Sequence, residues 1–204
     1  MLVVGITGSI GAGKTTLALV LEEKGVEVLD ADLIAHEVTE PQSPVWREVV
    51  DEFGESVLGK NKEIDRKKLA EIVFANSEKL EALNRIVHPR VIERVNSKLK
   101  ELRKEKPNTI AVIDAPLLIE AGMKEMLDLL VVVVTKEELR LARTAGLGLT
   151  AVEMRNRNEK QMPQEEKARY ADYVIENEGS LEELKQKAEN LWQVLQKKLE
   201  EKRV

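Results

Sequence analysis

The sequence predicts an α/β fold, a three-layer sandwich in which helices cover a parallel five-stranded sheet. Apolar, β-branched runs of strand length alternate with longer segments whose apolar residues recur at helical spacing. One of these runs, 129–134, has no polar face, which is typical of a strand buried on both sides of a parallel sheet. A glycine-rich loop also joins the first such run to a helix, as in many α/β nucleotide-binding proteins.

The first predicted strand, 2–7, leads into the loop GSIGAGKT at 8–15, which fits the phosphate-binding pattern G-x-x-x-x-G-K-[ST]. Its glycines let the backbone approach a ligand, so that consecutive N–H groups can surround phosphate oxygens. The helix that follows adds free N–H groups and the positive end of its dipole. The alternative, a turn that only tightens a strand–helix joint, is disfavoured by the flanking elements. The predicted ATP-binding residues of this segment are Gly8, Gly11, Ala12, Gly13, Lys14, Thr15 and Thr16.

Within this loop, Lys14 can reach the β- and γ-phosphates, and the Thr15 hydroxyl can bind Mg²⁺. A second strand, 26–29, then ends at Asp30-Ala31-Asp32. Because residues i and i+2 of a strand face the same way, we expect both carboxylates at the ligand-binding edge of the sheet. One of them can hold Mg²⁺ through water or take a proton from an acceptor hydroxyl. The alternative is that one only caps the next helix, 33–38.

From the break at 40–44 to about 106 the pattern is entirely helical. Asp65 is expected to cap a helix over 66–75, and the pair His88-Pro89 to interrupt a later one. A lone histidine is more often structural than functional. Because this block lies between the second and third strands, it is a candidate acceptor-binding insertion.

The third strand, 109–113, ends at Asp114, the Walker-B arrangement that orients Mg²⁺. The basic helical stretch 136–169 is expected to form a lid that closes over the phosphates, or else a solvated helical face. A hinge or turn is predicted at 146–148, and a last strand at 171–177. Ser180 and Glu183 fit a capping box that opens the C-terminal helix.

Composition excludes several other classes. The chain carries 32 basic and 37 acidic residues, a net charge of −5, and no basic run of the kind that marks nucleic-acid binding. No apolar stretch has the length of a membrane span, and no signal peptide is recognised. There is no cysteine, and the two histidines form no zinc motif. We therefore expect a cytoplasmic protein with neither nucleic-acid nor membrane partners, whose oligomeric state stays open.

This order of elements is that of a small-molecule kinase of the P-loop class. Along nearly its whole length the chain resembles the dephospho-coenzyme A kinase family. The matching segments are GITG at 5–8 with the loop, VLDAD at 28–32, IDR at 64–66, LNRIVHP at 83–89, DAPLLIE at 114–120, Gln161 with Lys167, and ADYVIENEG at 171–179.

The resemblance implies ATP-dependent phosphorylation of the ribose 3′-hydroxyl of dephospho-CoA, the last step of coenzyme A synthesis, with Mg²⁺ as cofactor. It implies that Asp32 is the general base or orients the hydroxyl, and that Asp114 assists Thr15 at the metal. Arg66 and His88 would belong to the acceptor-binding region.

For the lid, the resemblance implies that Arg140, Arg143 and Arg157 neutralise charge on the transferring phosphoryl group, with Lys14, Asp32, Arg140 and Arg143 as the catalytic set. Asn177 and the turn at Gly179 would lie near the adenine. Family members usually carry two arginines in the first lid helix, followed by an acidic-glycine turn. The second position falls here near Ala145 or Gly146, which leaves open which arginine contacts the phosphate.

The expected organisation is a single P-loop kinase domain. Its nucleotide-binding core spans about 1–31 and 109–204, the helical insertion about 32–108, and the lid about 136–169. A P-loop switch GTPase would need a guanine-reading N-K-x-D motif, and the sequence has none. Another P-loop nucleoside or nucleotide kinase stays open as the alternative, because sequence physics alone does not identify the ligand of the insertion.

Overall fold

The computed structural model describes residues 1–146 and 150–202 and divides the chain into two compact units. Unit 1 comprises Met1–Asp30 and Leu99–Val204, and unit 2 comprises Ala31–Lys98. One helix, α5 (Ser77–Glu105), belongs to both. The predicted turn at 146–148 falls largely on 147–149, outside the described residues.

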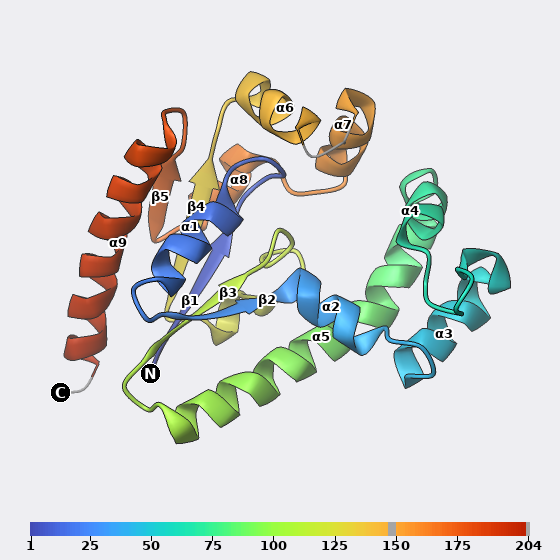
Figure 1. Cartoon of the computed structure of the whole chain (residues 1–204), viewed down its shortest axis with the longest axis horizontal. Coiled ribbons are helices and arrows are strands. Elements are labelled where there is room, and N and C mark those ends of the chain that lie inside the picture. The colour runs from blue at the N-terminus through green and yellow to red at the C-terminus, as the bar shows by residue number, and fades with distance from the viewer. Residues whose placement is uncertain (147–149, 203–204) are drawn as a thin grey trace. The chain divides into compact units, whose positions relative to one another are not determined.

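Unit 1 is built on a five-stranded sheet in the order β2-β3-β1-β4-β5 (Figure 1). All pairs are parallel, which confirms the predicted sheet. The carboxyl ends of the strands therefore meet at one edge, and Ile6 pairs in register with Asp114 on one side and with Val131 on the other. The strands are β1 (Leu2–Thr7), β2 (Glu27–Asp30), β3 (Ile110–Asp114), β4 (Leu129–Val134) and β5 (Tyr173–Glu176).

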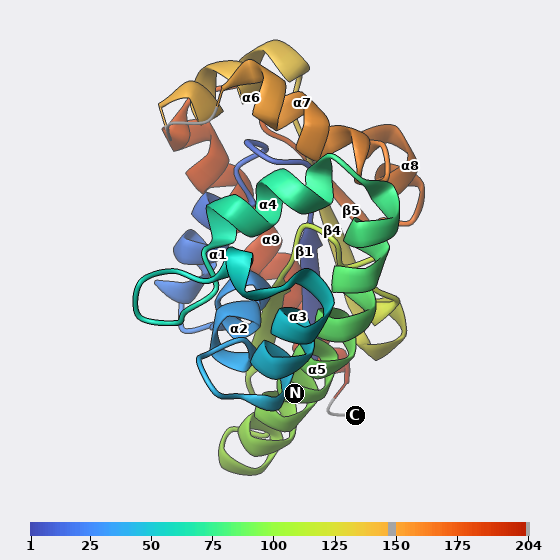
Figure 2. The same cartoon turned by 90° about the vertical axis from the view of Figure 1, so that its right-hand side faces the viewer.

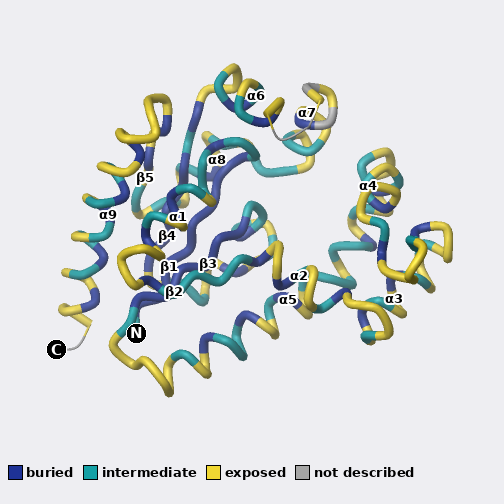
Figure 3. The backbone as a smooth tube through the Cα atoms, viewed as in Figure 1, coloured by how far each residue is buried: buried dark blue, intermediate teal, exposed yellow. Residues whose placement is uncertain are grey.

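Helices α1 (Lys14–Glu22) and α9 (Leu181–Glu201) cover one face of this sheet (Figure 1). The opposite face carries Gly5, where an added Cβ would lie 2.8 Å from the side chain of Leu118 and 2.5 Å from that of Leu127. The segment after β3, with the short 3₁₀ helix η2 (Met123–Met126), thus forms the third layer. Figure 3 shows the central strands as the most buried part of unit 1.

The predicted helical lid segment forms three short helices between β4 and β5. They are α6 (Glu137–Ala145), α7 (Ala151–Glu159) and α8 (Gln164–Arg169). At the other end of β5, the Ser180 hydroxyl accepts the backbone N–H of Glu183 and so caps α9, as the sequence predicts.

Unit 2 is entirely helical apart from an isolated β-bridge between Leu58 and Ile64. Figures 1 and 2 show α3 and α4 beside the N-terminal half of α5, and a separate apolar core joins these elements. Asp65 caps α4 by accepting the backbone N–H groups of Lys67 and Lys68, which confirms the predicted cap. The elements before α5 are α2 (Ala31–Val38), α3 (Pro44–Phe53), η1 (Glu55–Val57) and α4 (Arg66–Phe74).

The expectation that Asp30 and Asp32 both extend from a strand is wrong. Strand β2 ends at Asp30, and Asp32 lies in the first turn of α2. Ala31 favours helix, and an acidic side chain in a first turn is stabilised by the helix dipole, so the helix begins two residues earlier than predicted.

The predicted interruption at His88-Pro89 is also absent, because α5 continues through Pro89. A proline inside a helix loses one backbone hydrogen bond and crowds the preceding turn. Here the ring lies on an exposed position, while Ile86 and Val87 pack against the apolar core of unit 2 and Val91 is buried. This packing outweighs the local cost of the proline.

Candidate functional site

The phosphate loop connects β1 to α1 and has no room for side chains at its glycines. Gly8 has a φ of +147°, and a Cβ there would lie 2.3 Å from the carbonyl oxygen of Val133. A Cβ at Gly11, with a φ of +78°, would lie 2.9 Å from the carbonyl oxygen of Arg140. The loop therefore packs directly on the end of β4 and on α6, which fixes the direction of its N–H groups.

The loop is also held from the side of β5. The side-chain amide of Asn177 donates to the carbonyl oxygen of Ala12 at 2.8 Å, and only 5% of Asn177 is exposed. The buried hydroxyl of Thr135 lies 3.1 Å from the carbonyl oxygens of both Ala12 and Asn177. The hydroxyl has a single proton, and the Ala12 carbonyl already accepts from the Asn177 side chain. We therefore assign the hydrogen bond of the Thr135 hydroxyl to the carbonyl oxygen of Asn177. We call Ala12, Thr135 and Asn177 the loop clamp.

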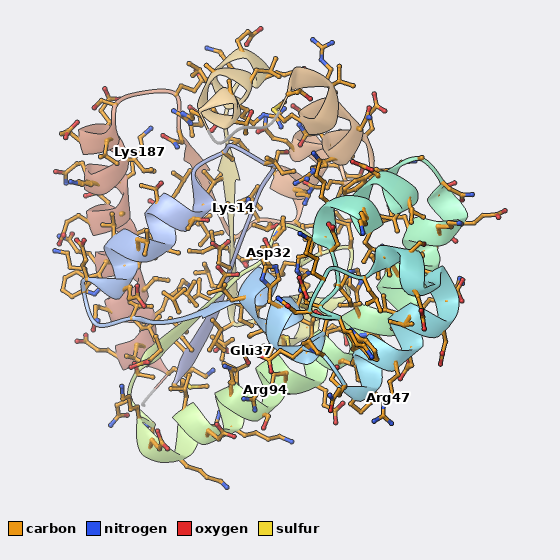
Figure 4. All side chains as sticks on the ribbon, turned by 45° about the vertical axis from the view of Figure 1, so that its right-hand side comes forward. Lys14, Asp32, Glu37, Arg47, Arg94 and Lys187 are labelled. Carbon is orange, nitrogen blue, oxygen red and sulfur yellow. The ribbon has the colours of Figure 1, made fainter. Side chains whose placement is uncertain are left out.

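Lys14 begins α1 (Figure 4), and its ammonium group donates to the carbonyl oxygen of Ser9 within the loop at 3.3 Å. The neighbouring Thr15 hydroxyl makes a long hydrogen bond of 3.4 Å to a carboxylate oxygen of Asp114. Asp114 is only 6% exposed and pairs in register with Asp30 of β2. The structure thus brings together the two predicted metal ligands.

Hydroxyl and carboxylate oxygens are the ligand types that Mg²⁺ prefers. Among residues 1–146 and 150–202 there is no cluster of three or more His, Cys, Asp or Glu side chains that could hold a metal. Mg²⁺ usually binds through one or two protein oxygens, substrate phosphates and water. Thr15 and Asp114 therefore fit that ion.

Two arginines on α6 have donors with no partner in the described part of the chain. Arg140 is only 9% exposed, yet its Nε and Nη1 atoms make no hydrogen bond there, and neither does the buried Nη1 of Arg143. Buried donors are normally paired, because an unpaired one costs about 1–3 kcal/mol. The main chain of Arg140 packs against Gly11 of the phosphate loop, so the helix that carries both arginines lies beside the loop.

In unit 2, Arg66 and Asp32 interact electrostatically. The Arg66 guanidinium donates to the hydroxyl of Thr39 at 2.8 Å, and that hydroxyl donates to the Ala35 carbonyl at 2.6 Å. Partial burial lowers the pKa of Arg66, and the charge of Asp32 acts against this effect. The start of α4 is thereby tied to the end of the helix that carries Asp32. The third predicted acceptor residue, His88, is partly buried on α5.

Two polar residues of the site were missed in the sequence. Thr135 directly follows β4, and Thr7 is the last residue of β1. The signal that identified Asp114, a polar residue where an apolar strand ends, applies to both of them. Their partners are carbonyl groups far away in the chain, which no local pattern predicts.

Within the described ranges, none of the helices has both the length and the apolar character needed to span a membrane. The comparison with known proteins identifies one family. The family described as "Dephospho-CoA kinase" matches residues 2–183. The chain is similar to the dephospho-CoA kinase of Syntrophus aciditrophicus, with 42% identity over 200 residues that cover 97% of this chain and 85% of that protein.

Two solved structures show the same likeness. The protein TT1252 from Thermus thermophilus superposes with a TM-score of 0.78 at 37% identity, covering 95% of this chain and 97% of that one. The dephospho-CoA kinase from Campylobacter jejuni superposes with a TM-score of 0.70 at 30% identity, covering 96% and 97% of the two chains.

The loop clamp gives a testable expectation. Replacing Thr135 by Val keeps the shape of the side chain but removes the donor to the buried Asn177 carbonyl, which costs about 1–3 kcal/mol of folding free energy. Because the clamp orients the phosphate loop, we also expect the Kd for ADP to rise about fivefold in calorimetry, equivalent to about 1 kcal/mol. Thr135→Ser retains the hydroxyl and is the matched control. Equal ADP affinity in the Val and Ser variants would contradict the clamp.

Proposed function

The chain belongs to the dephospho-CoA kinase family, and we propose that it transfers the γ-phosphoryl group of ATP to the ribose 3′-hydroxyl of dephospho-CoA. The observation that carries this proposal is the phosphate loop with Lys14 and Thr15, beside Asp114 and packed against the main chain of Arg140, whose buried side chain has donors without a hydrogen-bond partner among the described residues. Groups of this kind catalyse phosphoryl transfer, a reaction in which positioning and charge neutralisation supply most of the catalysis.

For ATP, we propose that the loop amides and Lys14 bind the β- and γ-phosphates. Arg140 and Arg143 would neutralise the charge on the transferring group, a role supported by their buried nitrogens that have no hydrogen-bond partner among the described residues. The turn that follows Asn177 would contact the adenine, while the Asn177 side chain serves the loop clamp. Arg157, on α7, is a further lid candidate.

We propose Mg²⁺ as the cofactor, held by Thr15 directly and by Asp114 directly or through water, as their oxygen chemistry and proximity support. When bound, such an ion neutralises phosphate charge. The expected cytoplasmic location and the expected lack of nucleic-acid partners stay predictions.

For the acceptor, we propose that Asp32 takes the proton of the 3′-hydroxyl. The hydroxyl oxygen then forms a bond to the γ-phosphorus while the bond from that phosphorus to the β–γ bridging oxygen breaks, and ADP leaves. Asp32 follows Asp30 by two residues, and Asp30 pairs in register with Asp114, which supports this role. Arg66 and His88 are proposed to bind the acceptor.

A coupled ADP-release assay with Mg-ATP tests the proposed reaction. The acceptors would be dephospho-CoA, adenosine, AMP, CMP and shikimate. We expect turnover with dephospho-CoA alone. Turnover confined to a nucleoside or a nucleotide would overturn the acceptor assignment while leaving the phosphate-loop mechanism in place.

Replacing Asp32 by Asn removes the proton acceptor but keeps the shape of the side chain. General-base catalysis typically contributes 10²–10⁴-fold, so we expect kcat to fall at least about 100-fold with ADP affinity unchanged. Asp51→Asn, which changes an exposed carboxylate on α3, serves as the matched control. Loss of ADP binding in the Asp32 variant would instead indicate a metal-binding or structural role.

Replacing Arg66 by Ala removes a cation proposed to bind the acceptor. We expect KM for dephospho-CoA to rise about tenfold or more, since hydrogen bonds to charged groups contribute about 1.5–3 kcal/mol, while KM for ATP changes little. Arg47→Ala removes an arginine of the same unit at a distance from Asp32 (Figure 4) and should change neither constant. A larger effect on KM for ATP than for the acceptor would refute the role of Arg66.

A further inference from the structure

Unit 1 contains a completely buried lysine that the proposed reaction does not use. The side chain of Lys167 on α8 has 0% exposure, and its ammonium group lies 2.9 Å from a carboxylate oxygen of Glu120. Burial lowers the pKa of Lys167, and Glu120 acts in the opposite direction. Burying a charge is expensive even when it is paired, so a structural lysine here would gain little over an apolar residue.

The partners of Lys167 explain its position. Its ammonium group also donates to the carbonyl oxygen of Pro116 at 2.5 Å. Pro116 is two residues beyond Asp114, and its carbonyl accepts a second hydrogen bond, of 3.1 Å, from the hydroxyl of Thr7. Thr7 is the last residue before the phosphate loop. One carbonyl group thus joins the end of β1, the loop after β3, and α8.

The carboxylate of Glu120 extends this connection. The oxygen that pairs with Lys167 also accepts the backbone N–H of Met162 at 2.9 Å, in the connection between α7 and α8. Two residues later, the Gln164 side chain accepts the backbone N–H of Thr135 at 2.8 Å. Thr135 belongs to the loop clamp. The contacts therefore run without a break from the loop after Asp114 to the clamp on Ala12.

We propose that Lys167 and Glu120 form a positioning pair that holds the loop after Asp114 in register with the phosphate loop. The inference rests on the proposed function, because it concerns the alignment of Asp114 and Thr15 toward Mg²⁺ and the phosphates. The pair acts through the Pro116 carbonyl and the Met162 N–H.

The test compares Lys167→Met, Glu120→Gln and the double variant. If the pair only balances charge, the double variant should recover both stability and kcat, whereas a positioning role predicts that it recovers stability alone. Each single variant leaves one charge of the pair without its partner, so both are expected to be less stable to urea than the double variant. Both variants that carry Lys167→Met lack the donor to Pro116. We therefore expect kcat to stay at least tenfold below wild type in Lys167→Met and in the double variant, with KM for dephospho-CoA within twofold.

A second readout does not depend on turnover. Calorimetric titration measures the Kd for ADP at a series of Mg²⁺ concentrations. From these values we obtain the Mg²⁺ concentration at which half of the total Mg²⁺-dependent gain in ADP affinity is reached. We expect this concentration to rise at least threefold in Lys167→Met and in the double variant. Lys202→Met is the matched control. Lys202 also pairs with a carboxylate, that of Asp128, and this carboxylate likewise accepts a backbone N–H. Unlike Lys167, the Lys202 side chain is 45% exposed. It should leave both readouts unchanged.

The proposal would be overturned if the double variant recovered kcat and the Mg²⁺ response as well as its stability, since the pair would then only balance charge. An unchanged Mg²⁺ response in a folded Lys167→Met protein would overturn it as well. Failure of the proposed function appears differently. Wild-type protein would then bind Mg-ADP without phosphorylating dephospho-CoA, and the calorimetric comparison of the variants would still decide the positioning role.

Discussion

The candidate nucleotide site depends on the parallel direction of all five strands, which brings their carboxyl ends to one edge of the sheet. Thr7, Asp114, Thr135 and Asn177 each end or directly follow a different strand. The phosphate loop can keep its left-handed glycines because these side chains and the end of β4 surround it. The site is therefore a property of the sheet edge as a whole, more than of the loop alone.

Much of this edge could be predicted from the sequence, because its signals are local. The loop pattern, the strand that ends at Asp114 and the caps at Asp65 and Ser180 each depend on a few neighbouring residues. The position of Asp32 was predicted in the wrong element, since the length of β2 depends on its pairing with β3. The continuity of α5 through Pro89 depends on the core of unit 2, which no window of sequence contains.

The polar contacts that join distant segments could not be predicted from the sequence either, because they too depend on how the chain folds. Thr135, Asn177 and Lys167 act on carbonyl groups 42 to 165 residues away in the chain. Lys167 stood out in the sequence only as a match to the family pattern, and its complete burial and its partners became visible only in the structure. In unit 2, the contact between Arg66 and Thr39 likewise needs the helices to be placed before it can be recognised.

The division of the chain into units affects how the protein assembles during synthesis. Unit 2 is one continuous segment, whereas unit 1 is split, and its central strand β1 pairs only with strands that lie more than 100 residues later. The ribosome therefore releases all of unit 2 before β1 can find β3 or β4. Long-range pairing of this kind is slow, because a large loop must close first. Until it forms, the apolar residues of β1 lack the neighbours that bury them in the folded sheet.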